Sequence, residues 1–293
     1  MNKTFRSVAV TVTPFTDENH PDLEEIAFQT AAFGESKIDA IFPCASTGEY
    51  VKMTVEDKCA ILKTVSAANH GVKALVAGAC AASVDEAKVY IAAAKANGYD
   101  ACVVCPPYYF PQSQTDILRF YREIAVCAEG LPVIAYHVPF FTTGIEMDTF
   151  RRLLEVPGVT GMKDSSANMK RIAHCCDLAA TARPDFSVFT GTDDCLLPAL
   201  CAGCRGSMTA LGASMPDAVA AIYAAFDAGE LALAMQLQRS VLAILRQADS
   251  LTFPLGYKLL AKAAGMKIEE IGGVQPAEVY AAMLQRLGKE PSQ

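Results

Sequence analysis

The sequence predicts an α/β fold, a (β/α)₈ TIM barrel followed by a helical extension. Two observations support this prediction. Short apolar runs that fit strands alternate with longer segments of helical periodicity, and the alternation repeats eight times, the number that closes a parallel barrel. An open, doubly wound sheet is the alternative, and it is disfavoured because no Gly-x-Gly-x-x-Gly follows the first apolar run.

Each unit is a predicted strand followed by a predicted helix. Local signals mark some of the helix ends: Asp22 with Glu25 three residues later forms a capping pair, and Gly98 closes the third helix. The eight predicted units are 7–13 with 22–34, 40–44 with 54–69, 74–79 with 83–97, 101–105 with 115–128, 132–138 with 147–154, 159–163 with 168–180, 186–191 with 195–202, and 206–211 with 216–228.

The residues after position 229 show only helical patterns. We expect helices at 230–247, 254–265 and 276–287, because apolar side chains recur there at helical spacing. The predicted organisation is therefore a barrel domain at 1–229 and a helical extension at 230–293. Packing on the barrel and participation in a subunit contact are both compatible with this pattern.

Composition narrows the class of partner. Of all residues, 52% are hydrophobic and 19% are charged, and the net charge is -7 without any basic block. This balance argues against nucleic acid and anionic membrane as partners. No run of about 18 uncharged apolar residues occurs, and the first residues lead into a strand-like pattern without a signal-peptide core, so we expect a cytoplasmic protein.

Eleven cysteines are scattered through apolar segments, and we expect them to be reduced core residues. The pairs Cys175 with Cys176 and Cys201 with Cys204 lack the second pair or the histidines that a zinc site requires. No metal is therefore predicted.

Lys163 is the strongest functional signal, because it ends a β-type run that begins at Val159. Removing an ammonium group from water is costly, and a depressed pKa that leaves the amine neutral is the usual result. A neutral lysine amine can condense with a ketone to form a Schiff base. The alternative is a lysine whose amine simply reaches solvent at the strand end.

The loops after the strands of such a barrel meet at one face, where its chemistry takes place. Ser46 and Thr47 open a turn that fits either a carboxylate cradle or an ordinary capping turn. Tyr136 lies one strand before Lys163 and could transfer protons beside it. His137 must then point to the other side of the strand, so we expect it to be packed and hydrogen-bonded.

Two further strand ends carry polar or aromatic side chains. The stretch 105–111 is rich in proline and aromatic residues, and it either reaches into a site or covers the barrel rim. The stretch 190–194 ends in Asp193 and Asp194, which either bind substrate hydroxyls or cap the next helix.

Five motifs in this order resemble the dihydrodipicolinate synthase and N-acetylneuraminate lyase superfamily: Ser46-Thr-Gly-Glu49, Pro107-Tyr-Tyr109, Tyr136-x-Val-Pro139, Gly161-Met-Lys-Asp164 and Gly191-Thr-Asp-Asp194. The resemblance implies a class I, Schiff-base aldolase or dehydratase on a (β/α)₈ barrel, commonly a homotetramer. It implies that Lys163 is the Schiff-base lysine and Tyr136 the proton relay. It also implies that Ser46 and Thr47 hold a pyruvate carboxylate, and that Tyr109 projects across a dimer interface into the partner's site.

One departure from the family pattern bears on the substrate. The synthases have an arginine two residues after the proline of the Tyr-x-Val-Pro motif, and this chain has Phe141 there. Phenylalanine cannot pair with a substrate carboxylate, which disfavours the lysine-biosynthesis reaction. The Ser-Thr-Gly-Glu form is more similar to the sialic-acid and 2-keto-3-deoxy-sugar-acid branches. The predicted substrate-binding residues are Ser46, Thr47, Gly48, Phe141, Ser165, Gly191, Asp193 and Ser207.

The predicted function is a Schiff-base lyase or aldolase that cleaves or condenses pyruvate, or another 2-keto acid, with an aldehyde. A 2-keto-3-deoxy sugar acid or a sialic acid type substrate is expected. The imine on Lys163 serves as the electron sink, so no cofactor is predicted. The alternatives are 4-hydroxy-tetrahydrodipicolinate synthase and a non-catalytic keto-acid-binding barrel. The expected assembly is a homotetramer or homodimer.

Overall fold

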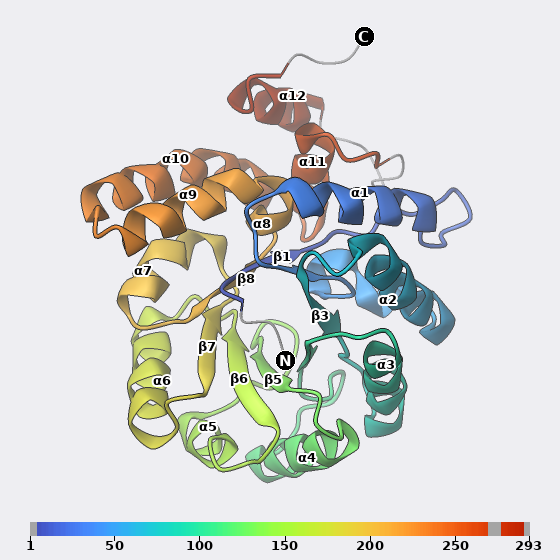
Figure 1. The fold of residues 1–293 in the computed structure, drawn as a ribbon, viewed down its shortest axis with the longest axis vertical. Helices are drawn as coiled ribbons and strands as arrows, with labels where there is room; N and C mark the ends of the chain where they lie inside the picture. Colours follow the sequence, from blue (N-terminus) through green and yellow to red (C-terminus); the bar gives the residue numbers. More distant parts are fainter. Residues whose placement is uncertain (1–4, 269–276, 290–293) are drawn as a thin grey trace.

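The computed structural model describes residues 5–268 and 277–289 and confirms the predicted (β/α)₈ barrel (Figure 1). Eight parallel strands follow one another around a closed barrel in chain order. The strands are β1 (Ser7–Val10), β2 (Ala40–Phe42), β3 (Ala74–Gly78), β4 (Ala101–Val104), β5 (Val133–His137), β6 (Val159–Asp164), β7 (Ser187–Thr190) and β8 (Gly206–Thr209).

The strands are mostly apolar because side chains fill the barrel on one face of the wall and helices cover the other. Every residue of β5 is buried, including the polar residue His137 at its end. In the register of β5 and β6, Tyr136 lies directly beside Lys163. The fold thus places the two predicted catalytic side chains at adjacent strand ends.

The outer helices begin at residues that accept backbone hydrogen bonds. The Asp22 carboxylate accepts from the backbone N–H of Glu25 at 3.0 Å, at the helix start that the sequence predicts. Thr54 and Asp57 form a reciprocal capping box. The helices are α1 (Leu23–Glu35), α2 (Val55–Asn69), α3 (Val84–Ala96), α4 (Gln114–Cys127), α5 (Met147–Leu153), α6 (Met169–Ala182), α7 (Leu196–Cys201), α8 (Leu211–Ser214) and α9 (Pro216–Asp227).

The end of the barrel differs from the predicted ranges. The last strand ends at Thr209, earlier than predicted, and the short helix α8 follows it. The backbone N–H of Leu211 donates to the Asp193 carboxylate at 3.2 Å, so this residue is held outside the strand ladder. The seventh helix is preceded by a 3₁₀ turn at Asp193–Cys195.

Three helices follow the barrel: α10 (Leu231–Asp249), α11 (Leu255–Ala264) and α12 (Ala277–Arg286). They correspond to the three predicted helices, and residue 276 of the third prediction lies outside the described residues. Figure 1 shows α10 beside α9, with α11 and α12 at the same end of the molecule. A second hydrophobic core joins α7, α8 and α9 to these three helices. The predicted extension from residue 230 therefore shares a hydrophobic core with the last helices of the barrel.

All eleven cysteines are free, and most are buried, as expected for reduced core residues. Cys59 and Cys127 are only partly buried, and Cys201 is exposed. In the described parts of the chain, no helix is both long and apolar enough to cross a membrane.

Candidate active site

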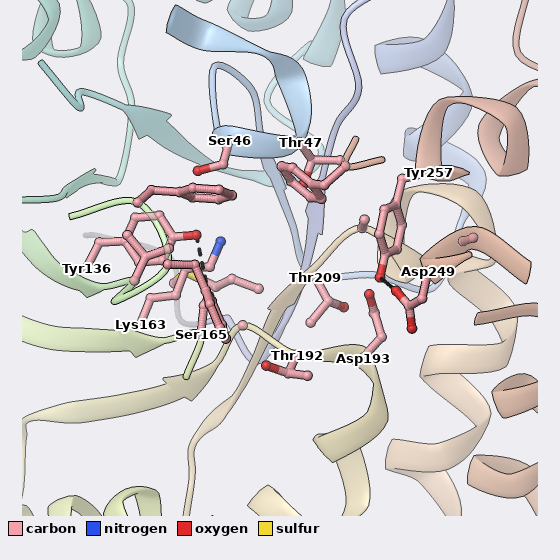
Figure 2. A pocket seen from close by; sticks show the side chains of 18 of the residues that line it. Ser46, Thr47, Tyr136, Lys163, Ser165, Thr192, Asp193, Thr209, Asp249 and Tyr257 are labelled. Carbon is pink, nitrogen blue, oxygen red and sulfur yellow. Dashed lines mark hydrogen bonds between the residues drawn. The ribbon is translucent and has the colours of Figure 1, made fainter. Parts of the chain in front are cut away.

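At the ends of the strands the barrel opens into a pocket of about 320 Å³ (Figure 2). Figure 2 shows Lys163, Tyr136 and Ser165 on one side of the pocket and Asp193, Thr209, Asp249 and Tyr257 on the other. The predicted site residues that line the pocket are Ser46, Thr47, Tyr136, Phe141, Lys163, Ser165, Gly191 and Asp193.

Lys163 lies near the end of β6 and is almost completely buried, with 3% of its surface exposed. Its Nζ lies 4.5 Å from the centroid of the Tyr136 ring and 5.0 Å from that of Phe42. Burial lowers the pKa of Lys163 to about 8, from an ordinary value of 10.5, although the nearby Cys80 and Asp193 oppose this shift. About one tenth of the amine is therefore neutral and nucleophilic at pH 7, far more than for an ordinary lysine.

Gly191 makes room for this lysine. A Cβ atom at this position would lie 1.9 Å from the Ser165 Oγ and 2.8 Å from the Lys163 Cε. Both distances are far below van der Waals contact, so any side chain at this position would displace the side chain of Lys163 or that of Ser165. The absence of a side chain at Gly191 therefore leaves the space that the Lys163 side chain occupies.

The end of strand β6 is fixed by Asp164, which points away from Lys163 because side chains alternate along a strand. The Asp164 carboxylate is fully buried, and it accepts from the backbone N–H of Ser166 at 2.9 Å and from the Arg171 Nε at 2.9 Å. These contacts hold the strand end that carries the amine. Arg171 was not singled out from the sequence, which gives no local signal for it.

The Tyr136 phenol lies between the lysine and the Ser46 turn. The Ser165 hydroxyl donates to the Tyr136 oxygen at 3.4 Å. Burial raises the pKa of Tyr136 to about 12, although hydrogen bonds with Ser165 and Ser46 oppose this shift. The phenol therefore keeps its proton at neutral pH, and it is placed to exchange that proton with a group bound at Lys163.

The turn that contains Ser46 and Thr47 is a 3₁₀ helix, η1 (Ser46–Gly48). The Thr13 hydroxyl donates to the carbonyl of Gly48 at 2.7 Å and holds the turn against β1. Gly48 itself does not line the pocket. A Cβ atom there would lie 3.0 Å from two oxygens of the β1 segment, so its contribution is close packing of the turn.

Glu49 follows this turn and connects it to the C-terminal helices. Its Oε1 lies 2.6 Å from the Nζ of Lys258 on α11, and both side chains are buried. Burial alone would raise the pKa of Glu49, but the hydrogen bonds from Lys258 and Lys52 bring it below its ordinary 4.5. This buried ion pair gives Glu49 a structural role.

Asp193 forms part of the opposite wall and is 5% exposed. Burial raises the pKa of its carboxyl to about 6, against the hydrogen bonds with Thr209 and the Leu211 N–H. Its neighbour Asp194 does not line the pocket, because its carboxylate pairs with Arg246 on α10. Of the two acidic residues, only Asp193 is therefore placed to contact a substrate.

The sequence interpretation missed part of the pocket wall. Asp249, Phe253 and Tyr257 all line the pocket, and they come from the end of α10, the connection and α11. The Tyr257 hydroxyl donates to the Asp249 carboxylate at 2.9 Å. The available signal was the polar stretch at 249–252 between two apolar helical patterns.

The prediction that Ser207 lines the site is wrong. Its side chain is 1% exposed, and its hydroxyl accepts a hydrogen bond at 3.0 Å from Tyr223 on helix α9, outside the barrel wall. Met208 and Thr209 line the pocket in its place.

Two other predicted residues lie outside this chain's pocket. Tyr109 is 87% exposed, and its role across a subunit interface stays a prediction. His137 is packed as expected, since its Nδ1 accepts from the backbone N–H of Ile145 at 2.9 Å. Within the ranges 5–268 and 277–289, no group of three or more His, Cys, Asp or Glu side chains is placed to hold a metal ion.

Comparison with known proteins gives a consistent result. The model of the Dihydrodipicolinate synthetase family matches residues 3–274. The chain is 32% identical over 241 residues to the 4-hydroxy-tetrahydrodipicolinate synthase of Dechloromonas aromatica (strain RCB). This match covers 82% of this chain and 81% of that protein.

Two solved structures share the fold of the chain. Dihydrodipicolinate synthase from Aquifex aeolicus has a TM-score of 0.88 at 23% identity, and N-acetylneuraminate lyase from Mycoplasma synoviae has 0.85 at 23% identity. Both likenesses cover 97% of each chain. The family model spans nearly the whole barrel and most of the extension, and the five motifs lie within it. The chain therefore belongs to the dihydrodipicolinate synthetase family, whose members are class I, pyruvate-dependent aldolases and lyases.

Proposed function

We propose that the chain is a lyase that forms an imine between Lys163 and pyruvate, and that cleaves or forms a carbon–carbon bond next to that imine. The observation that supports this most directly is the buried amine with a pKa of about 8 beside the Tyr136 phenol. Burial supplies the neutral nucleophile, and the phenol supplies the proton transfer.

The proposed reaction starts when the neutral Lys163 amine attacks the keto carbon, and loss of water gives a protonated imine. In the cleavage direction, the carbon–carbon bond breaks and its electron pair moves into the enamine. The proton of the substrate hydroxyl passes through Tyr136 as that hydroxyl becomes the carbonyl of the released aldehyde. Protonation of the enamine and hydrolysis of the imine then release pyruvate. The imine is the electron sink, so this scheme needs no cofactor.

Ser46 and Thr47 are proposed to hold the carboxylate of the keto acid. Both line the pocket, and Ser46 lies on the side of Tyr136 (Figure 2). A turn of this kind offers hydroxyl and backbone N–H donors to an anion. Together with Lys163, this arrangement orients the keto carbon toward the amine.

The aldehyde half is proposed to carry no carboxylate. Of the described residues that line the pocket, Lys163 has the only cationic side chain. Its amine becomes part of the imine, so it is not available to pair with a carboxylate on the aldehyde. Asp193 and Thr209 line the same pocket and can accept hydrogen bonds from hydroxyl groups of such an uncharged partner. The name of the Dechloromonas relative supports the synthase reaction as the second candidate. Slow condensation of pyruvate with aspartate semialdehyde, relative to uncharged aldehydes, would argue against that candidate.

The test is borohydride trapping with intact-mass measurement. Pyruvate and borohydride should add one reduced pyruvyl group to the wild-type chain, and peptide mapping should place it on Lys163. Lys163→Met should lose this adduct, whereas Lys170→Met, which removes an exposed lysine of α6, should keep it. An adduct that persists in Lys163→Met would disprove the proposed imine. Adduct formation without turnover of any aldehyde would favour a binding protein.

A further inference from the structure

We propose that the segment 249–257 selects the aldehyde, and that the site prefers an uncharged aldehyde that carries an aromatic ring. The inference rests on the proposed lyase function and assigns specificity to Phe253 and Tyr257, with Phe141 beside Phe253. Imine formation with pyruvate does not depend on these side chains.

Three aromatic rings form a continuous row along the pocket wall, which we name the aromatic row: Phe141, Phe253 and Tyr257. The ring centroids of Phe141 and Phe253 are 5.7 Å apart, and those of Phe253 and Tyr257 are 6.0 Å apart. These are the separations at which aromatic rings interact favourably. The row joins the loop after β5 to the start of α11, so it crosses two distant parts of the chain.

The aromatic row remains open to solvent. Phe141 is 53% exposed and Phe253 is 43% exposed, and both line the same pocket as Lys163. A ligand that covers exposed apolar surface in a concave site removes that surface from water, and this favours binding. An aryl group attached to the reacting aldehyde would cover these rings while its carbonyl carbon approaches the imine.

The charges in the pocket exclude an acidic aldehyde. Asp193 and Asp249 bring two carboxylates to the wall, and the Lys163 amine is converted to the imine. Arg246 lies 3.1 Å from the Asp249 carboxylate but is not among the residues that line the pocket. A carboxylate on the aldehyde would therefore lose its hydration without gaining a cation.

Tyr257 gives the row a polar end. Its hydroxyl donates to Asp249 at 2.9 Å, which fixes the ring edge against the last turn of α10. Burial also raises the pKa of this phenol above its ordinary range, so it stays protonated. A ring substituent with a hydroxyl group could share this hydrogen bond.

The experiment measures kcat/KM for condensation of pyruvate with benzaldehyde, glyceraldehyde and succinic semialdehyde. The wild-type chain should prefer benzaldehyde to the other two by about tenfold or more. Phe253→Ala should lower kcat/KM for benzaldehyde by about tenfold, with little change for glyceraldehyde. Phe253→Leu, which keeps apolar volume without the ring, should show a smaller loss in the same direction.

The matched control is Phe28→Ala, which removes a 66% exposed phenylalanine of α1 outside the pocket and should leave all three values unchanged. Every variant is first tested for the borohydride adduct with pyruvate. A normal adduct with preference for glyceraldehyde or succinic semialdehyde would overturn the inference alone, as would equal loss for all aldehydes in Phe253→Ala. Absence of the adduct in the wild-type chain would overturn the proposed function itself.

Discussion

At the scale of single residues, Lys163 illustrates how reactivity and stability oppose each other. The folded chain holds this side chain at 3% exposure, which lowers its pKa to about 8 from 10.5. Between these two values the unfolded chain binds the proton more strongly than the folded chain. The free energy of unfolding should therefore increase as the pH rises from about 8 to 10.5.

Replacing Lys163 by methionine should thus stabilise the fold. The difference between the two pKa values corresponds to about 3 kcal/mol at pH 7, and Lys163→Met should gain up to that amount. At pH 10 the gain should fall to about 1 kcal/mol, because this pH is close to the ordinary lysine pKa of 10.5 and removing the proton on folding then costs little. Urea unfolding of the wild-type chain and of Lys163→Met at both pH values measures this gain in the free energy of unfolding. A gain that does not change between pH 7 and pH 10 would rule out the charge as its cause.

The rate of imine formation should follow the same ionisation. The neutral fraction of the Lys163 amine increases through pH about 8, so trapping by borohydride at low pyruvate should speed up about tenfold for each pH unit below that value and level off above it. Measurement of trapping rates from pH 6 to 10 tests this expectation. A profile that still rises at pH 10 would mean that the amine keeps an ordinary pKa.

Local sequence patterns were sufficient to identify the residues at the strand ends but not which way each side chain points. Lys163 and Tyr136 follow clear apolar runs, so strand pairing placed them together. Gly206 and Ser207 begin a strand with no alternation of apolar and polar residues, and the inward face could not be assigned there. The structure shows that Met208 lines the pocket and that Ser207 binds Tyr223 instead.

At the scale of elements, the buried pair between Glu49 and Lys258 connects the Ser46 turn, where we propose that the carboxylate binds, to α11. Lys258→Met should leave a buried carboxylate with only the exposed Lys52 as a cationic partner. The expected loss is about 3 kcal/mol in the free energy of unfolding, with a higher KM for pyruvate because the neighbouring Ser46 turn loosens. Denaturant unfolding and steady-state kinetics measure both effects.

The double variant Glu49→Gln, Lys258→Met provides the control for this pair. It removes both charges, so it should recover much of the stability lost in Lys258→Met. If the double variant is as unstable as the sum of the two single variants, the pair is not energetically coupled. This connection was not predictable from the sequence, because the two residues are far apart in the chain and neither helical nor strand periodicity relates them.

At the scale of the whole molecule, the fold was predicted with its eight units in the right order, because each unit has its own local pattern. The pocket wall at 249–257 could not be predicted in the same way. No alternation rule determines where a helix pair docks on a barrel, and this docking depends on the second hydrophobic core shared by α7 to α12. The extension therefore looked like an appendage in the sequence although it lines the pocket in the structure.

The proposed assembly of subunits has its own test. Tyr109 has a positive φ of 83° and is 87% exposed in a single subunit, and its reach into a partner's site stays a prediction. Tyr109→Phe and Lys163→Met should each be nearly inactive. Mixed dimers of the two should regain one intact site, so mixing the subunits should restore activity to about one quarter of the sites.

Sedimentation of the wild-type chain should give two or four times the mass of 31.2 kDa. Unfolding and refolding the two variants together ensures exchange of subunits, and each variant refolded alone serves as the control. If the mixture is as inactive as its components while the sedimenting species remains an oligomer, Tyr109 does not act across the interface.

The position of the α10 to α11 connection also has an evolutionary consequence. Strand β6, which carries the Lys163 amine, packs in one hydrophobic core, whereas Tyr257 packs against the other, and the two lie far apart in the chain. Substitutions in nine consecutive residues, 249–257, could therefore alter which product is made without disturbing any strand of the barrel. Gene libraries limited to this segment should yield new acceptor preferences while the first half of the reaction is inherited unchanged.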